Sequence, residues 1–339
     1  MKIKKFYGDK HRKLYNLLPL STPLSLMIDP ANICNFQCKF CPTGNPHLLK
    51  DIKRPKGIMS YELFCKIIDD LTKFPNKLKR LHLYKDGEPL LNKNISKMVY
   101  YAKIKNISDS VEITTNASLL NEKIALELIE SGLDKIRISV EHINNEGYKS
   151  ITKKYSNYLK IFENIRFLYL KKKELKNKLH IHIKILDIGL TQEELNIFFD
   201  DYSNFSDSIF VDEIMGWSNS EKFDFTLRKN PIYAMDNNTN VNNNRLVCPQ
   251  PFYTLSINFN GLISVCCVDW TMNTIVGDCK KEDLISIWNG ELLKEFRLMH
   301  LDKEKYKNKA CNNCNYLKGM SKESDIDPFI NKLKKVYSV

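Results

Sequence analysis

Apolar and polar residues follow two alternating patterns along the chain up to about residue 214. Short runs rich in Ile, Val and Leu predict β-strands, and longer stretches with apolar residues at helical spacing separate them. This alternation predicts an α/β fold with a parallel sheet and right-handed crossovers. The six predicted strands span residues 24–29, 79–85, 111–115, 135–140, 179–186 and 208–214.

The predicted helices carry recognisable start and stop signals. One helix runs from Ser60 with its apolar residues three and four positions apart. Another has Glu122 in its first turn and Gly132 as a left-handed stop. Six strand–helix units are too few to close an eight-stranded barrel.

The pattern changes after Trp217. An Asn-rich stretch at 237–244 has little to bury and predicts a linker. Beyond it, Asn260-Gly261 separates a strand at 253–259 from a second strand that ends in Cys266-Cys267, and this predicts a hairpin. We therefore divide the chain into an N-terminal extension (1–23), a barrel (24–217), a linker (218–247), a small cysteine-containing α+β domain (248–320) and a C-terminal helix (321–339).

Composition and charge narrow the class of protein. The chain has 339 residues, enough for one large and one smaller domain, and it holds neither an apolar run long enough to span a bilayer nor a signal peptide. We expect a cytoplasmic protein, in which the ten cysteines act as metal ligands and core thiols rather than disulfides. The net charge is +12, but the lysines are scattered as on solvated faces, so we do not expect a nucleic-acid partner.

Three cysteines, Cys34, Cys38 and Cys41, lie close together after the first predicted strand. Tetrahedral zinc and a fully ligated [4Fe-4S] cube each take four protein ligands, so a trio indicates a cluster with one iron left open for a cofactor. An alternative is a structural zinc knuckle completed by His47.

The Cys-x-x-x-Cys-x-x-Cys spacing, with Phe40 just before the last cysteine, resembles the signature of the radical S-adenosylmethionine enzymes. The resemblance implies a [4Fe-4S] cluster whose open iron binds S-adenosylmethionine and whose electron cleaves it to methionine and a 5′-deoxyadenosyl radical. It also implies a partial (β/α)6 TIM-type barrel with the site at the carboxyl ends of the strands.

Later motifs resemble the family in the same order. Residues Gly87, Glu88 and Pro89 resemble the Gly-Gly-Glu-Pro element that binds the methionine amino group, although Asp86 replaces its first glycine and leaves the local backbone shape open. The resemblance further implies contacts to the cofactor from polar residues at strand ends. These are Thr115, Asn116 and Ser139, with Glu141 where aspartate is usual.

The C-terminal region resembles the SPASM or twitch domains that hold auxiliary iron-sulfur clusters. The match is Cys248, twelve residues, Gly261, four residues and Cys266, followed by Cys311-x-x-Cys314. The resemblance implies that these four cysteines ligate one auxiliary [4Fe-4S] cluster, since no cysteine follows Cys314. Two other thiols lie in this region, Cys267 as an alternative to Cys266 and Cys279 as a spare. A closed four-thiolate zinc site is the alternative.

A fully ligated auxiliary cluster indicates electron transfer, so we expect oxidation of a sugar, nucleotide sugar or cyclitol, as the resemblance to the cyclitol dehydrogenase of this family implies. A flavodoxin- or ferredoxin-type protein would supply electrons. The candidate general base is Asp269, with Arg228 and Glu141 as alternatives, although Asp269 also fits a simple turn role.

Two other functions remain open. One is a peptide maturase. Such enzymes often carry an N-terminal leader-binding domain, and we expect the 33 residues before Cys34 to be too few for it. The other is a non-catalytic metal-binding scaffold, because Asp86 replaces a cofactor-contacting glycine.

Overall fold

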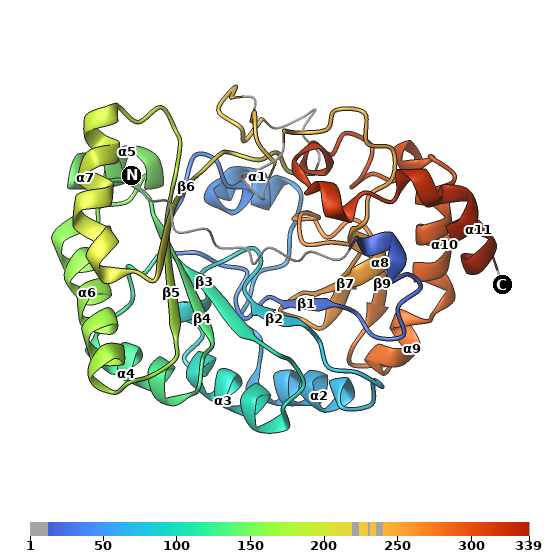
Figure 1. Cartoon of the computed structure of the whole chain (residues 1–339), viewed down its shortest axis with the longest axis horizontal. Helices are drawn as coiled ribbons and strands as arrows, with labels where there is room; N and C mark the ends of the chain where they lie inside the picture. The colour runs from blue at the N-terminus through green and yellow to red at the C-terminus, as the bar shows by residue number, and fades with distance from the viewer. Residues whose placement is uncertain (1–12, 219–223, 230, 235–239, 339) are drawn as a thin grey trace.

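The computed structural model describes residues 13–218, 224–229, 231–234 and 240–338. One sheet of nine strands runs through them in the order β6-β5-β4-β3-β2-β1-β7-β8-β9 (Figure 1). Strands β1 to β6 are all parallel and correspond to the six predicted strands. Their bounds are Ser25–Ile28, Arg80–Leu83, Val111–Thr115, Lys135–Val140, His180–Leu186 and Ser208–Asp212.

Helices α2, α3, α4 and α6 cover the outer face of the curved sheet (Figure 1). The predicted start of α2 is confirmed, because the Ser60 hydroxyl accepts a hydrogen bond from the backbone N–H of Leu63. The predicted stop of α4 is also confirmed, because Gly132 follows the helix with a φ of +78°. The α-helices are α1 (Pro46–Asp51), α2 (Tyr61–Leu71), α3 (Ile95–Lys105), α4 (Glu122–Glu130), α5 (Asn145–Thr152), α6 (Tyr158–Glu174), α7 (Gln192–Tyr202), α8 (Gln250–Tyr253), α9 (Leu284–Trp288), α10 (Glu291–Leu301) and α11 (Ile330–Tyr337).

The C-terminal region adds its strands to the barrel sheet. Strand β7 (Thr254–Ile257) pairs in parallel with β1 along its whole length, and β8 (Leu262–Ser264) and β9 (Ile275–Asp278) follow antiparallel. The predicted hairpin is confirmed, with φ +88° at Gly261. Leu26 and Ile28 of β1 share one buried apolar cluster with Leu255 and Ile257 of β7. The two halves of the chain therefore have a common core.

The second hairpin strand is shorter than predicted. Strand β8 ends at Ser264, and its register with β9 shifts between Ile263 and Ser264. A shift of this kind interrupts the ladder and bends the strand. Cys266 and Cys267 therefore lie beyond the regular strand. Their side chains do not have to follow the alternation between the two faces of a sheet.

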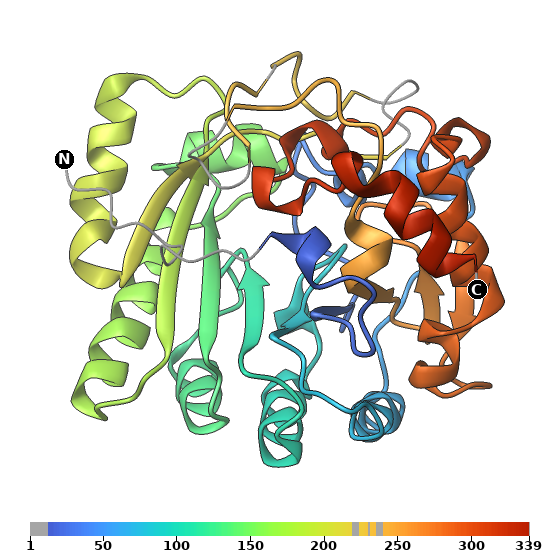
Figure 2. The same cartoon turned by 45° about the vertical axis from the view of Figure 1, so that its right-hand side comes forward.

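The C-terminal segment is less helical than predicted. Helix α11 begins only at Ile330, and short 3-10 turns precede it because Pro328 cannot donate a helical hydrogen bond and disfavours helix at the residue before it. Figure 2 shows α11 (red) lying beside α10. The 3-10 helices span Leu14–Asn16, Pro42–Gly44, Pro89–Leu91, Ser203–Phe205, Lys305–Lys307, Tyr316–Gly319, Lys322–Ser324 and Asp327–Phe329.

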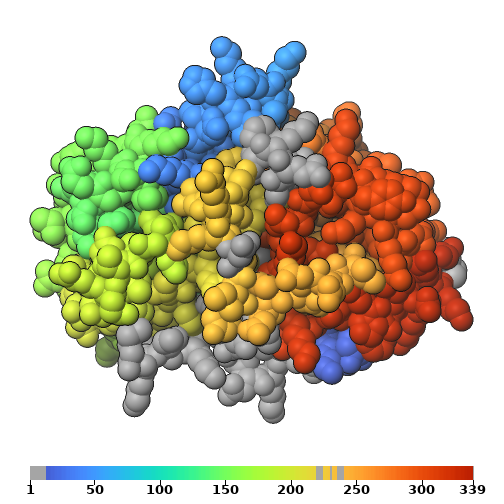
Figure 3. Space-filling view, turned by 90° about the horizontal axis from the view of Figure 1, so that it is seen from above, coloured from blue at the N-terminus to red at the C-terminus, as the bar shows by residue number. Residues whose placement is uncertain are grey.

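The predicted linker, 218–247, lies partly outside the described residues, including 237–239 of its Asn-rich stretch. In its described part, the Ser218 hydroxyl donates to the Val268 carbonyl at 2.5 Å, and Phe225 packs edge-on against Trp270. Figure 3 shows this segment (gold) between the barrel half (green) and the C-terminal half (red). The domain boundaries stay a prediction.

We predict that the β1–β7 joint is a main source of stability. Replacing the fully buried Ile257 by Ala should lower the free energy of unfolding by about 2–5 kcal/mol, because the cavity would lie in the shared core. Chemical denaturation of the metal-free protein, followed by circular dichroism, measures this. The control is Ile104→Ala on α3, where the side chain is 56% exposed and the loss should stay within about 0.5 kcal/mol. Equal losses in both variants would contradict the shared core.

Candidate active site

A cavity of about 490 Å³ lies at the carboxyl ends of the barrel strands. The structure brings together around it all but one of the predicted cofactor and cysteine-trio residues. Pro89 is the exception, because it begins a 3-10 helix and does not line the cavity. The predicted residues that line it are Cys34, Phe40, Cys38, Cys41, Gly87, Glu88, Thr115, Asn116 and Ser139.

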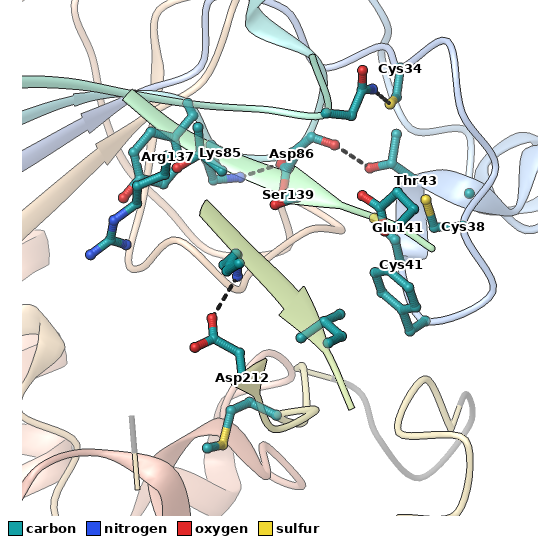
Figure 4. A pocket seen from close by; sticks show the side chains of 18 of the residues that line it. Cys34, Cys38, Cys41, Thr43, Lys85, Asp86, Arg137, Ser139, Glu141 and Asp212 are labelled. Atoms are coloured by element: carbon teal, nitrogen blue, oxygen red, sulfur yellow. Dashed lines mark hydrogen bonds and ion pairs between the residues drawn. The ribbon is translucent and has the colours of Figure 1, made fainter. Parts of the chain in front are cut away.

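The cysteine trio lies on the loop that follows β1 (Figure 4). Backbone hydrogen bonds from Cys41 to Cys38 and from Gly44 to Cys41 fold the loop tightly. A Cβ at Gly44 would lie 2.3 Å from the Cys38 carbonyl oxygen, so only glycine fits there. Burial raises the pKa of Cys34 to about 12, so this thiol keeps its proton until a metal displaces it. His47 is exposed on α1 and does not line the cavity.

The Gly87-Glu88 turn is packed against the cysteine loop. A Cβ at Gly87 would lie 2.1 Å from the Ala31 carbonyl oxygen and 2.3 Å from that of Ile33, so this glycine allows a close approach of two backbones. The Glu88 carboxylate accepts from the Thr115 hydroxyl at 2.7 Å and from the Asn116 backbone N–H at 2.8 Å. Burial raises the pKa of Glu88 to about 6, although these hydrogen bonds act to lower it.

Strand β3 is tied to the cysteine loop through Asn116. The Asn116 side-chain amide donates to Asn35 Oδ1 at 3.0 Å and to Cys34 Sγ at 3.8 Å. The Thr115 hydroxyl also donates to Glu88. These bonds join the cysteine loop, the Gly87-Glu88 turn and the end of β3, and we call these three segments the rim of the cavity. Sequence reasoning missed Asn35, which stands inside the cysteine motif and carries no signal of its own.

The residue that departs from the family motif is part of a buried ion-pair group. Asp86 has no positive φ, so its backbone does not need a glycine. Its Oδ2 atom accepts from Arg54 Nη2 at 2.7 Å and from Lys85 Nζ at 2.5 Å, with all three side chains almost fully buried. The Asp86 carbonyl also accepts from the Thr43 hydroxyl (Figure 4). These contacts fasten the segment after the trio to the glycine turn.

A neighbouring carboxyl completes this buried group. Burial, and next the charge of Asp86, raise the pKa of Asp29 to about 7. The backbone N–H of Asp86 approaches Asp29 Oδ1 at 3.5 Å. Sequence reasoning missed both Arg54 and Lys85, because a single basic residue in a chain with many scattered lysines and arginines has no distinctive pattern.

The second cysteine set does not line the cavity, although Cys267, the chain neighbour of Cys266, does. Burial, and also the charges of other cysteines of the set, raise the pKa of Cys248, Cys266 and Cys311, so these thiols lie near one another and near Cys314. Within the described ranges, no three His, Cys, Asp or Glu side chains converge as ligands of a single metal ion.

The two spare thiols differ in position. Cys267 lines the cavity together with Val268 and Tyr316, beside the Lys85–Asp86 pair, and burial raises its pKa to about 11. Cys279 is fully buried in the apolar core, near Lys66 and Asp70. The chain thus presents Cys267, rather than Cys266, to the cavity.

The expected general base does not reach the cavity. Asp269 is buried, and its carboxylate accepts from the backbone N–H groups of Asn273 and Thr274 and from the Thr271 hydroxyl, so it caps its own turn. We therefore correct that expectation in favour of the turn role. Arg228 is exposed and also does not line the cavity, whereas Glu141 does. Burial raises the pKa of Glu141 to about 7, although Lys184 opposes the shift.

We predict that Arg54 is needed for the packing of this rim. Arg54→Met should lower the free energy of unfolding by about 3–5 kcal/mol, because it removes one partner of a buried ion pair. Lys50→Met, on the exposed side of α1, serves as the control and should change stability little. The double variant Arg54→Met, Asp86→Gly should regain part of the loss, since it removes the stranded charge as well. A double variant less stable than Arg54→Met would contradict this account.

Two family models match the chain. One is described as the radical SAM superfamily and matches residues 28–197, and the other is described as an iron-sulfur cluster-binding domain, SPASM, and matches residues 248–315. The GTP 3′,8-cyclase of Clostridium botulinum is 33% identical over 149 residues, which are 43% of this chain and 41% of that protein. The chain therefore spans about two fifths of the length of this curated relative.

Solved structures share the fold. BtrN in complex with AdoMet and 2-DOIA has a TM-score of 0.55 and 17% identity, over 90% of this chain and 97% of BtrN. SuiB from Streptococcus suis bound to the precursor peptide SuiA has a TM-score of 0.63 and 18% identity, over 95% of this chain and 75% of SuiB. The superfamily model covers half of the sequence, including the cysteine trio and barrel strands β2 to β5. The chain therefore belongs to the radical SAM superfamily, whose members use a [4Fe-4S] cluster and S-adenosylmethionine, and it carries a SPASM iron-sulfur domain.

Proposed function

We propose that this protein is an oxidoreductase that abstracts a hydrogen atom from a carbohydrate or cyclitol-type substrate and oxidises it. One observation carries the proposal. One cavity is lined both by the cysteine trio and by Cys267, whose chain neighbour Cys266 belongs to the second cysteine set. A substrate in this cavity would lie between the two sets.

We assign the first [4Fe-4S] cluster to Cys34, Cys38 and Cys41, and one auxiliary [4Fe-4S] cluster to Cys248, Cys266, Cys311 and Cys314. When bound, these groups and S-adenosylmethionine supply the 5′-deoxyadenosyl radical and an acceptor for the second electron. The chain holds the cofactor side with Gly87, Glu88, Thr115, Asn116, Ser139 and Phe40, all at the cavity wall. A flavodoxin- or ferredoxin-type protein would be the reductant.

Oxidation of an alcohol also releases a proton, and we propose Glu141 as its acceptor. Glu141 lines the cavity and follows β4, two residues after Ser139, and burial raises its pKa to about 7. A carboxyl whose pKa lies near the working pH accepts and returns protons efficiently. This assignment replaces Asp269.

The main alternative is modification of a peptide. It is favoured by the likeness to SuiB bound to its precursor peptide, which shares the fold at 18% identity. Beyond the cofactor residues, Tyr84, Thr114 and His182 line the cavity and could hydrogen-bond the hydroxyl groups of a sugar or cyclitol. We therefore place the carbohydrate class first.

The trio assignment predicts which variants lose cofactor cleavage. Anaerobically reconstituted protein with a strong reductant and S-adenosylmethionine should form 5′-deoxyadenosine even without substrate. Cys34→Ala, Cys38→Ala or Cys41→Ala should each abolish it, whereas Cys65→Ala on α2, outside the cavity, should not. Product analysis by chromatography measures this. Cleavage that survives loss of a trio cysteine would refute the assignment, and no cleavage in fully reconstituted wild type would favour a non-catalytic scaffold.

The oxidation itself predicts a partial reaction in a variant of the second set. A sugar or cyclitol deuterated at the reacting carbon should pass its label into 5′-deoxyadenosine, as mass spectrometry would detect. Cys311→Ala should still transfer label but form little oxidised product, because the second electron has no acceptor. Label transfer from a peptide Cα or Cβ alone would favour the maturase. Equal product from a folded variant that lacks the auxiliary cluster would rule out its electron-accepting role.

A further inference from the structure

The inner face of the barrel is polar, whereas branched apolar side chains usually fill such a face. On β5, three isoleucines belong to the apolar core of the chain. The residues that alternate with them, His180, His182 and Lys184, therefore point to the inner face. Strands β2, β3, β4 and β6 repeat this alternation. Their inner polar residues are, in strand order, Arg80 and His82, Glu112 and Thr114, Lys135, Arg137 and Ser139, and Ser208 and Asp212.

A hydrogen-bonded chain of three of these side chains runs along β5 and β6, which pair side by side (Figure 1). The Ser208 oxygen lies 2.8 Å from His182 Nδ1 and 2.8 Å from His180 Nε2. A hydroxyl has a single proton, so between two neutral rings it donates to one and accepts from the other. The chain is therefore continuous from one imidazole to the other.

The two ends of this chain lie at different depths of the barrel. His182 lines the cavity, whereas His180 and Ser208 do not. His180 is the first residue of β5 and is only half-buried, and it lies about 7 Å along the strand from His182. Solvent reaches this end of the barrel, because the side chain of Arg80, the first residue of β2, is 44% exposed. The chain thus connects the cavity with the solvent-accessible amino end of the barrel.

The surroundings of both rings favour the neutral form. Burial, and next the charge of Arg137, lower the pKa of His182 to about 3, and burial also lowers the pKa of His180. A neutral imidazole has one donor and one acceptor nitrogen, as such a chain requires, whereas an imidazolium can only donate. The other charged groups near His182 are Lys135, Lys184 and Asp212, and those near His180 are Glu112, Lys135, Lys172 and Asp207.

We propose that His182, Ser208 and His180 form a proton relay through which the cavity exchanges protons with solvent at the amino end of the barrel. The use of this relay rests on the proposed function, since oxidation of an alcohol releases a proton inside the cavity. Glu141 accepts that proton, and a substrate hydroxyl or a water molecule passes it on to His182. The proton can then leave while cofactor and substrate still fill the cavity.

The transfer balances at each step. A proton taken up at His182 Nε2 allows Nδ1 to give its proton to the Ser208 oxygen. Ser208 gives its own proton to His180 Nε2, and His180 releases a proton to solvent from Nδ1. One proton enters and one leaves, so neither ring stays charged and each ends as its other tautomer.

The chain itself is tested without a substrate. In reconstituted holoenzyme labelled with nitrogen-15 histidine, the ring nitrogen shifts report the tautomer and charge of each ring, and His180→Gln and His182→Gln assign the signals. At pH 7 both rings should be neutral, and both should carry their proton on Nδ1 or both on Nε2, because one hydroxyl joins Nδ1 of one ring to Nε2 of the other. Ser208→Ala should shift the nitrogen signals of both rings.

The control is Ser110→Ala, which removes a hydroxyl just before β3 that donates to Glu112 and not to either ring. It should leave both sets of ring signals unchanged. Circular dichroism and iron content verify that each variant folds and holds its clusters. If Ser208→Ala does not fold, His180→Gln breaks the same relay at its solvent end.

The use of the relay is tested with deuterated glucose and deuterated myo-inositol as probes. Ser208→Ala should pass the label into 5′-deoxyadenosine as the wild type does, yet form oxidised product roughly ten- to a hundredfold more slowly, because proton transfer by positioned groups is lost. Ser208→Thr keeps the hydroxyl and should keep most of the rate, and Ser110→Ala should keep all of it. A purely structural role of Ser208 would lower label transfer and product together.

Three results would overturn the inference. These are a charged ring at pH 7 or two rings with different tautomers, ring signals that Ser208→Ala leaves unchanged, and product formed at the wild-type rate by folded Ser208→Ala. The last result would leave the proposed oxidation standing. Conversely, absence of label transfer from sugars and cyclitols would end the proposed oxidation, and the ring signals would still decide whether the relay exists.

Discussion

The pairing of β1 with two neighbours is the constraint on which the rest of the structure depends. Its four residues pair with β2 on one side and with β7 on the other, in the same parallel direction. The loop that leaves β1 carries the cysteine trio, and the chain that leaves β7 and β8 carries Cys266 and Cys267. Because β1 and β8 belong to one sheet, with only β7 between them, the cysteine trio and Cys267 line the same cavity.

Buried charge near the cysteine trio is the second constraint. Near the trio, the Asp86 carboxylate forms buried ion pairs with Arg54 and Lys85. The aspartate that replaces the family glycine therefore stabilises the local packing. A buried ion pair adds little net stability, but removing one partner leaves an uncompensated buried charge and is strongly destabilising. The pair therefore holds the segment after the trio against the Gly87-Glu88 turn.

Much of this could be predicted from the sequence, because the informative signals are local. The buried parallel strands appear as apolar runs, so all six were located, and the cysteine spacings identified the family. The β1–β7 pairing could not be predicted, since it joins residues more than two hundred positions apart with no local signature. The Arg54–Asp86 pair was missed for the same reason, and Asp269 was misjudged because its neighbours in sequence do not reveal that its carboxylate caps a turn.

The central claim is that one chain holds two separate cubane clusters on either side of one cavity, and metal counting tests it most directly. Reconstituted wild type should contain about eight irons and eight sulfides per chain, and the triple variant Cys34→Ala, Cys38→Ala, Cys41→Ala should retain about four of each in a form that can still be reduced. A triple variant with the full wild-type content, or one whose remaining metal is zinc, would contradict the account.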